Sequence, residues 1–272
     1  MTTVPRTTTA ARRGIAMAAK RRILPLRRRP APAVQSLPVS AEPTPVTASP
    51  SLYRLMTWLS PSYPVGAFSY SSGIEWAVEC GDIAGVDALH GWLAVMMADG
   101  AGFCDGVLFA HAHRAVQSDV GGDLRAAAEL AAALVPTRER FLETTAQGRA
   151  FVEATRAAWP CAALEKLAEI WDGAVAYPIA VGVAAAGHGI PLAHALPAYL
   201  HAVLANWISA AIRLVPLGQT DGQRALAALE SVVAATVERA SAAALDDIGS
   251  AAFRADLASA KHETQYTRLF RS

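Results

Sequence analysis

The candidate metal ligands of this chain fall into two groups of histidines: His111 with His113, and His188, His194 and His201. Residues two apart on a helix point about 200° apart, so His111 and His113 could share an ion only in an extended segment. In the second group, Pro197 stands between the last two members. The spacing therefore favours histidines that form local hydrogen bonds in a core or an interface, and we assign no metal-binding residue.

Other side chains with chemical potential lack the neighbours that catalysis requires. The cysteines Cys80, Cys104 and Cys161 are far apart and form no CxxC, as is typical of small buried hydrophobes in a reducing compartment. The serines near residue 70 do not form GxSxG. There is no GxxxxGK[ST] and no GxGxxG, so any nucleotide must belong to a partner. We expect a protein without catalytic residues or an intrinsic cofactor. A metal-dependent enzyme that uses the His111 pair and nearby carboxylates stays open as an alternative.

Charge divides the chain into two parts. Residues 1–50 hold nine Lys/Arg, one acid and eight prolines, which predicts a disordered basic leader. An organelle transit peptide or a segment that binds anionic surfaces is the alternative. Residues 51–272 keep 15 basic and 22 acidic residues, a net charge of −7, which argues against nucleic acid as a partner.

The second part reads as a single all-α domain. Of the 272 residues, 53% are hydrophobic and 17% charged, enough for a large core. Apolar residues recur at helical spacing from Leu52 onward, and no run alternates with period two. Thr220 and Gln223 fit a capping box that opens a helix with Leu226, Leu229, Val233 and Val237 on one face.

Residues 59–75 have an unusual composition for the link between two helices. They include two prolines, two glycines and three aromatic residues: Pro61, Pro64, Gly66, Gly73, Tyr63, Phe68 and Tyr70. The prolines restrict the backbone and the glycines permit turns that a Cβ would forbid. Ser72 and Glu75 match a capping box, which predicts a new helix from there. From spacing alone an ordinary structured turn is favoured, and a rigid, aromatic connection between two helices is the alternative.

Residues 173–212 contain no Asp, Glu, Lys or Arg. About twenty apolar residues can span a bilayer, so a membrane-embedded protein is one reading. Against it, three prolines divide the run and three histidines and Asn206 add polar groups. We predict helices that are buried in the core or in an oligomer interface, and no membrane association.

The last residues combine aromatic and basic side chains. If residues 255–272 are helical at their end, Tyr266, Leu269 and Phe270 form one apolar stripe beside Arg268 and Arg271, a suitable docking surface. A frayed terminus is the alternative.

Three segments, at 59–75, 213–223 and 262–272, resemble the signatures of the urease accessory protein F (UreF) family. The second reads RLVPLGQTDGQ and the third HETQYTRLFRS. The resemblance covers residues 51–272. Ala260-Lys261 stands where Met-Arg is expected, and Leu257 where Ile is expected. These conservative departures bear on affinity rather than on role.

The resemblance implies a non-enzymatic, dimeric, cytoplasmic maturation factor. It would bridge the scaffold protein UreD (also called UreH) and the GTPase UreG, and the complex would deliver nickel to apo-urease in a GTP-dependent step. Nickel and GTP are then handled by the assembled complex. The resemblance implies that the tail contacts UreD. We hypothesise that residues 59–75 help to shape the dimer and the GTPase-facing surface. The partner-binding candidates are Pro61, Tyr63, Pro64, Gly66, Phe68, Ser69, Tyr70, Gly73, Glu75, Arg213, Gly218, Gln219, Asp221, His262, Glu263, Gln265, Tyr266, Arg268, Leu269, Phe270 and Arg271.

Overall fold

The computed structural model describes residues 50–118 and 120–272, and all regular structure in that part of the chain is helical. The predicted leader lies outside the described residues, except for Pro50. The helices are α1 (Pro50–Trp58), α2 (Ile74–Glu79), α3 (Val86–Asp99), α4 (Ala101–Ser118), α5 (Gly121–Ala133), α6 (Arg138–Ala158), α7 (Ala162–Ile170), α8 (Tyr177–Gly187), α9 (Leu192–Leu214), α10 (Gln219–Ala228), α11 (Glu230–Ala242) and α12 (Phe253–His262), with 3-10 turns η1 (Ala67–Ser69) and η2 (Leu245–Asp247). The all-α prediction is confirmed.

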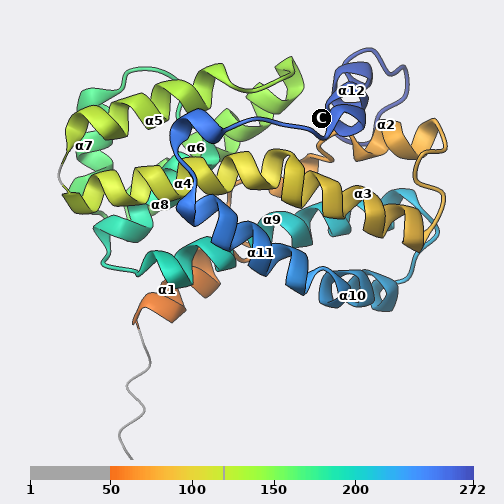
Figure 1. Ribbon diagram of the computed structural model, residues 1–272, viewed down its shortest axis with the longest axis horizontal. Helices are drawn as coiled ribbons and strands as arrows, with labels where there is room; N and C mark the ends of the chain where they lie inside the picture. The colour runs from red at the N-terminus through yellow and green to blue at the C-terminus, as the bar shows by residue number, and fades with distance from the viewer. Residues whose placement is uncertain (1–49, 119) are drawn as a thin grey trace, which may run out of the picture. The chain divides into compact units, whose positions relative to one another are not determined.

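Helix α8 is at the centre of the core. Every residue from Pro178 to Ala185 is buried, and the helix packs most extensively against α4 and α6. Small residues permit this close approach, since a Cβ on Gly182 would lie 2.8 Å from the carbonyl oxygen of Phe109 on α4. In Figure 1, α7 lies at one end of this helical body and α2 and α12 at the other. The uncharged sequence of α8 follows from its burial on all sides.

Helix α9 is the second part of the uncharged segment, and it runs without interruption through Pro197. The prediction that this proline divides the segment is wrong. Pro197 lies in the second turn, where it removes only one backbone hydrogen bond, and the neighbouring Leu196, Tyr199 and Leu200 are fully buried. Tertiary packing here outweighs the local helix-breaking tendency.

Two helical stretches are long and apolar enough to cross a bilayer: Val86–Ser118, which is α3 with α4, and Leu192–Leu214, which is α9. In the most apolar window of each, 61% and 50% of the residues are buried inside the fold. Such burial is consistent with the core helices of a soluble protein. This burial supports the prediction of core helices for residues 173–212 over the membrane-embedded alternative.

The capping box predicted at Thr220 is also misplaced. Helix α10 begins two residues earlier, with Gly218 as its N-cap, and the Asp221 carboxylate accepts a hydrogen bond from Gly218 N at 3.2 Å. The helix predicted to continue through Val237 ends at Ala228, and α11 starts at Glu230. The break falls at Leu229, which is fully buried.

Gly148 on α6 provides a test of the packing around α8. A Cβ at this position would lie 2.0 Å from the Val175 carbonyl oxygen and 2.9 Å from Ala176 C. We expect Gly148→Ala to lower the free energy of unfolding by about 1–3 kcal/mol, because α6 must move away from this backbone. Urea denaturation measures the change. Gly91→Ala on α3 is the matched control, since nothing lies within 4 Å of its Cβ position. Equal effects of the two substitutions would show that the close approach does not contribute.

Candidate partner-binding site

The stretch between α1 and α2 is anchored by Tyr63. Its hydroxyl lies 2.9 Å from Thr155 Oγ1 on α6, and its ring lies 5.5 Å from that of Phe151. Burial raises the pKa of Tyr63, and the hydrogen bond to Thr155 opposes this. Tyr63 is buried, so it holds residues 59–75 against the core rather than offering a contact surface.

The capping box predicted at Ser72 is not formed. Ser72 has a left-handed backbone with φ of 55°, and its hydroxyl donates to Glu143 Oε1 at 3.0 Å. Ser72 Oγ in turn accepts from Arg140 Nη1 at 2.8 Å and from Trp207 Nε1 at 2.9 Å. Because these buried groups need partners, they take the hydroxyl that would otherwise cap α2. The Glu75 amide instead donates to Ser71 Oγ, at 3.3 Å.

Gly73 starts α2 with φ of 83° and brings it against α12. A Cβ here would lie 2.6 Å from Ser259 N and 2.9 Å from its Cα. Both the left-handed backbone and this close approach require glycine. The contact places Glu75, on the first turn of α2, next to the residues that follow α12.

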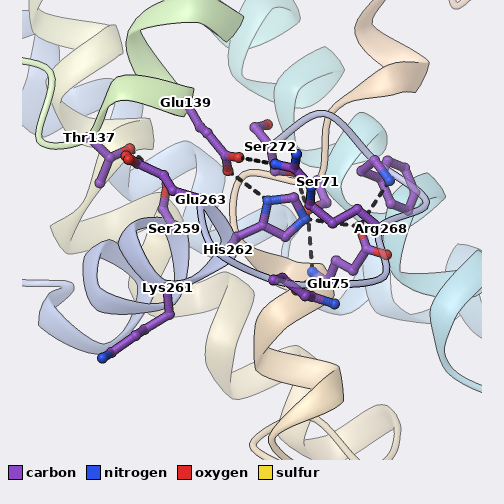
Figure 2. Close-up of polar contacts among 12 residues, drawn as sticks. Ser71, Glu75, Thr137, Glu139, Ser259, Lys261, His262, Glu263, Arg268 and Ser272 are labelled. Carbon is purple, nitrogen blue, oxygen red and sulfur yellow. Dashed lines mark hydrogen bonds and ion pairs between the residues drawn. The ribbon is translucent and has the colours of Figure 1, made fainter.

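A cluster of charged side chains, all buried except Arg268, joins α2, α6, α12 and the tail, which we define as residues 263–272 (Figure 2). His262 Nε2 lies 3.0 Å from Glu75 Oε2, and its Nδ1 lies 2.6 Å from Glu139 Oε2. The Glu75 carboxylate also accepts from the amides of Leu269 and Phe270, at 2.6 and 2.9 Å. Arg268 donates to Glu139 Oε1 at 2.8 Å. One carboxylate therefore binds both a side chain and the backbone of the tail.

The end of the tail lies alongside residues 69–71. The Arg271 amide donates to the Ser69 carbonyl at 2.8 Å, and the Ser71 amide donates to a Ser272 oxygen at 2.8 Å. The Ser71 hydroxyl also contacts that oxygen, and the Ser272 hydroxyl donates to Glu143 Oε2 at 2.8 Å. Two of the predicted segments, far apart in sequence, thus pair in space.

Arg213, from the third predicted segment, joins the other two. Its guanidinium carbon lies 4.3 Å from the centre of the Phe270 ring, and its Nη2 donates to the Phe68 carbonyl at 2.7 Å. Burial lowers the pKa of Arg213. A cation over an aromatic face is favourable, so this arginine clamps the tail and the η1 turn together.

The helical stripe considered for the tail does not exist. Helix α12 ends at His262, and the residues after it follow turns imposed by their bonds to Glu75 and Glu139. Phe270 points inward and is 4% exposed, whereas Leu269 is 64% exposed and Tyr266 fully so. The aromatic and apolar groups of the tail therefore divide between an inner anchor and an outer surface.

Comparison with known proteins agrees with these observations. A sequence model of the UreF family matches residues 83–230. A protein of Rhodopseudomonas palustris (strain BisB5), named urease accessory protein UreF, is 63% identical over 86% of this chain and 96% of its own length. Proteins of the same name from strain BisA53 and from Bradyrhizobium sp. (strain ORS 278) are 64% and 63% identical over 82% of this chain, and over 93% and 92% of their own lengths. The chain belongs to the UreF family. This is a family of urease accessory proteins and not of enzymes, as expected from the sequence.

The structure sorts the UreF-like candidate residues by exposure. Those on the surface are Pro61, Pro64, Phe68, Arg213, Gly218, Gln219, Tyr266, Arg268, Leu269 and Arg271. Those partly buried are Gly66, Ser69, Asp221, Glu263 and Gln265. Those buried within the chain are Tyr63, Tyr70, Gly73, Glu75, His262 and Phe270. The last group supports the surface from beneath. Gly218, Gln219 and Asp221 lie at the start of α10, apart from the paired segments.

Sequence reasoning missed the polar face of α6. Glu139 and Glu143 bind the tail and Ser72, and both are buried. They recur every four residues with Gln147 and Phe151, so all four share one face of the helix. That register was the available signal: the face marked as core by Phe151 continues through polar residues, which then need buried partners.

The histidines considered as metal ligands serve the fold separately. His111 and His113 lie on α4, and their Nε2 groups donate to the carbonyls of Ala243 (2.9 Å) and Ile190 (2.8 Å), on different elements. Burial lowers the pKa of His113. His188 donates to the Trp159 carbonyl at 3.0 Å. Within residues 50–118 and 120–272, no three His, Cys, Asp or Glu side chains are grouped to hold a metal ion.

A cavity of about 460 Å³ extends from Phe68 at the surface to Asp105, Arg140 and Glu143 inside the body. Asp105 Oδ2 accepts a hydrogen bond from Tyr199 at 3.0 Å. Burial raises the pKa of Asp105 to about 6, although Arg140 and the Tyr199 hydrogen bond lower it and Glu143 raises it further. The interior below residues 59–75 thus contains a carboxyl group with a pKa of about 6.

Asp105 makes a specific contribution to the pH dependence of stability. The pKa of Asp105 in the folded state exceeds the unfolded value of about 3.9. Its contribution to the free energy of unfolding is therefore fully present below about pH 4 and is lost as pH rises through about 6. The Asp105→Asn variant does not lose stability in this way, because an amide does not ionise. Relative to the parent, its unfolding free energy should rise by about 2–3 kcal/mol between about pH 4 and pH 7. Urea denaturation across that range measures it. The exposed Asp172→Asn serves as control, and a flat difference for Asp105→Asn would contradict the assignment.

Proposed function

We propose that this chain is a cytoplasmic urease maturation factor of the adaptor type. It bridges the scaffold protein UreD (UreH) and the GTPase UreG, and the assembled complex inserts nickel into apo-urease in a GTP-dependent step. The relatives' shared name, urease accessory protein UreF, supports the urease part of this proposal. Nickel and GTP are substrates handled by the complex, since the sequence contains no phosphate-binding loop.

The observation that carries the proposal is the pairing of the tail with the η1 turn. Together they present the exposed side chains of Phe68 (66%), Tyr266 and Leu269 on a backbone that is held by buried bonds. Aromatic anchors on a preorganised support are typical of binding hot spots, because little conformational entropy is lost on association.

Helix α12 extends the tail surface. Its side chains Phe253 and Leu257 are 75% and 58% exposed. Single exposed apolar residues are common on soluble proteins, but here two of them lie on the helix that leads directly into Tyr266 and Leu269. We assign α12 and the tail to UreD, and the η1 turn with Phe68 to the GTPase side.

A second surface suits the homodimer. The outer face of α1 and the first turns of α9 line a groove of about 680 Å³, and its residues are Ser51, Leu52, Leu55, Met56, Leu59, Ala193, His194, Pro197, Ala198, His201 and Ala202. Leu52 and Met56 are 59% and 69% exposed. The groove has no acidic or basic side chain other than the two histidines, as in the apolar interfaces of homodimers. We assign it to a second copy of the chain.

The partner surface predicts separate losses of the two partners. With N-terminally tagged protein co-expressed with its native UreD and UreG, Tyr266→Ala combined with Leu269→Ala should lower UreD recovery about 10-fold or more. Phe68→Ala should lower UreG recovery while UreD is retained. These side chains are exposed, so their removal leaves the buried bonds of the tail in place.

Val95→Ala is the control, because Val95 is also exposed but lies on α3. Recovery of both partners by every variant would contradict the assignment of this surface. Failure of the parent chain to recover either partner would contradict the adaptor function itself.

The dimer surface is tested by a charge in the groove. Met56→Arg should convert a dimer into a monomer, because a second copy would bury the guanidinium in an apolar groove without a partner. Sedimentation velocity at matched concentrations measures the change. Val86→Arg, at another exposed apolar position, should leave the dimer intact. A parent chain that is monomeric, or a Met56→Arg dimer, would contradict the assignment.

A further inference from the structure

We infer that His262 is a positioning residue that seats the tail through a proton on its ring, so that formation of the partner surface is coupled to pH. The coupling itself concerns contacts within this chain. Only its consequence for partner binding rests on the proposed function.

The ring of His262 is fully buried between two carboxylates. Glu75 on α2 lies 3.0 Å from Nε2, and Glu139 on α6 lies 2.6 Å from Nδ1. A neutral imidazole has one N–H and one lone pair, so it can donate to only one of these carboxylates. The other nitrogen would then direct its lone pair at a negatively charged oxygen. Both contacts are favourable together when each nitrogen has a proton.

The charges around the ring lead to the same state. The facing groups are Glu75 from α2, Glu139 from α6 and Arg268 from the tail. On α12 itself, Lys261 is exposed and points away from the cluster (Figure 2). Glu263, which follows α12, accepts a hydrogen bond from the Arg138 amide at 2.9 Å. Two carboxylates and one guanidinium leave one negative charge, which an imidazolium neutralises.

Arg140 and Glu143, also on α6, form an ion pair with each other. Arg140 Nη1 lies 2.7 Å from Glu143 Oε2, so this pair adds no net charge beside the cluster. A buried cluster with an unbalanced charge is strongly unfavourable. The cluster is neutral when both carboxylates are ionised and His262 is protonated.

The geometry is unsuitable for a metal ion in place of the proton. The two carboxylates bind opposite nitrogens of the same ring, so they cannot converge on one ion together with it. The described residues near His262 offer no third ligand group.

Loss of the proton would act on the tail through Glu75 and Glu139. Glu75 holds the amides of Leu269 and Phe270, and Glu139 holds Arg268. When these carboxylates move apart to relieve the repulsion, the tail loses its bonds at Arg268, Leu269 and Phe270, and only the contacts of residues 270–272 with residues 69–71, Glu143 and Arg213 remain. Leu269 and Tyr266 then leave the surface that they form with Phe68.

The test uses the full-length protein without partners. Nitrogen-15 NMR follows the protonation of the His262 ring while hydrogen exchange gives protection factors for the Leu269 and Phe270 amides, from about pH 5 to pH 8. Both protection factors should fall about 10-fold or more over the same pH interval in which the ring loses its proton. Protection that stays level while the ring deprotonates would overturn the inference.

Glu139→Gln separates proton coupling from ordinary packing. With one carboxylate removed, the charges of Glu75 and Arg268 balance each other. A neutral His262 can then donate a hydrogen bond to Glu75, while its other nitrogen accepts one from the side-chain amide introduced at position 139. Protection of the two tail amides should then be independent of pH across the range. A merely structural contact predicts instead that this variant weakens the tail at every pH. His90→Gln on α3, a histidine remote from the cluster, should retain the parent's pH step.

Partner capture distinguishes this inference from the proposed function. A pH step in tail protection that is matched by a step in UreD recovery supports both. A pH step in protection with constant UreD recovery supports the coupling and contradicts the role of the tail in binding UreD. Pulldowns with the Glu139→Gln variant at both ends of the pH range complete the comparison.

Discussion

The carboxylate of Glu75 is the group on which the partner surface of this UreF-family chain depends. It lies on the first turn of α2 and accepts from the Leu269 and Phe270 amides while it binds the His262 ring. Buried carboxylates are stable only when they are fully hydrogen-bonded, so Glu75 constrains the tail as strongly as the tail constrains Glu75. The glycine at position 73 makes this possible, because it allows α2 to begin in contact with the backbone of α12.

A polar interior beneath an apolar surface explains how this all-helical protein presents a defined shape in residues 263–272. Terminal residues are usually poorly ordered unless they are held by specific contacts. Here Glu139 and Glu143 on α6 accept hydrogen bonds from the tail, and Arg213 on α9 packs against the Phe270 ring. The exposed side chains Phe68, Tyr266 and Leu269 then project from a support that does not need to be ordered by the partner. Surface recognition and the interior network therefore form one unit.

The sequence was informative where local rules and burial agree. The helical periodicity, the core character of residues 173–212 and the separate roles of His111 and His113 follow from spacing and composition, and the structure agrees with them. The prediction of a capping box at Ser72 is wrong, because Glu143, Arg140 and Trp207 all form hydrogen bonds with the Ser72 hydroxyl. Local pattern rules contain no information about such distant partners. The tail stripe failed for the same reason, since Glu75 and Glu139 determine the path of the backbone.

By itself, the sequence determined the fold class and the family, because helical period, composition and short motifs are properties of neighbouring residues. It did not determine which of those residues face outward. That division was decided by the tertiary structure: Phe270 turns inward under Arg213, while Leu269 beside it turns outward. The same holds for His262, which belongs to a terminal motif in the sequence but is the centre of a buried charge cluster in the fold. Charge balance in a buried site is a property of residues brought together from four elements, so only the folded chain shows it.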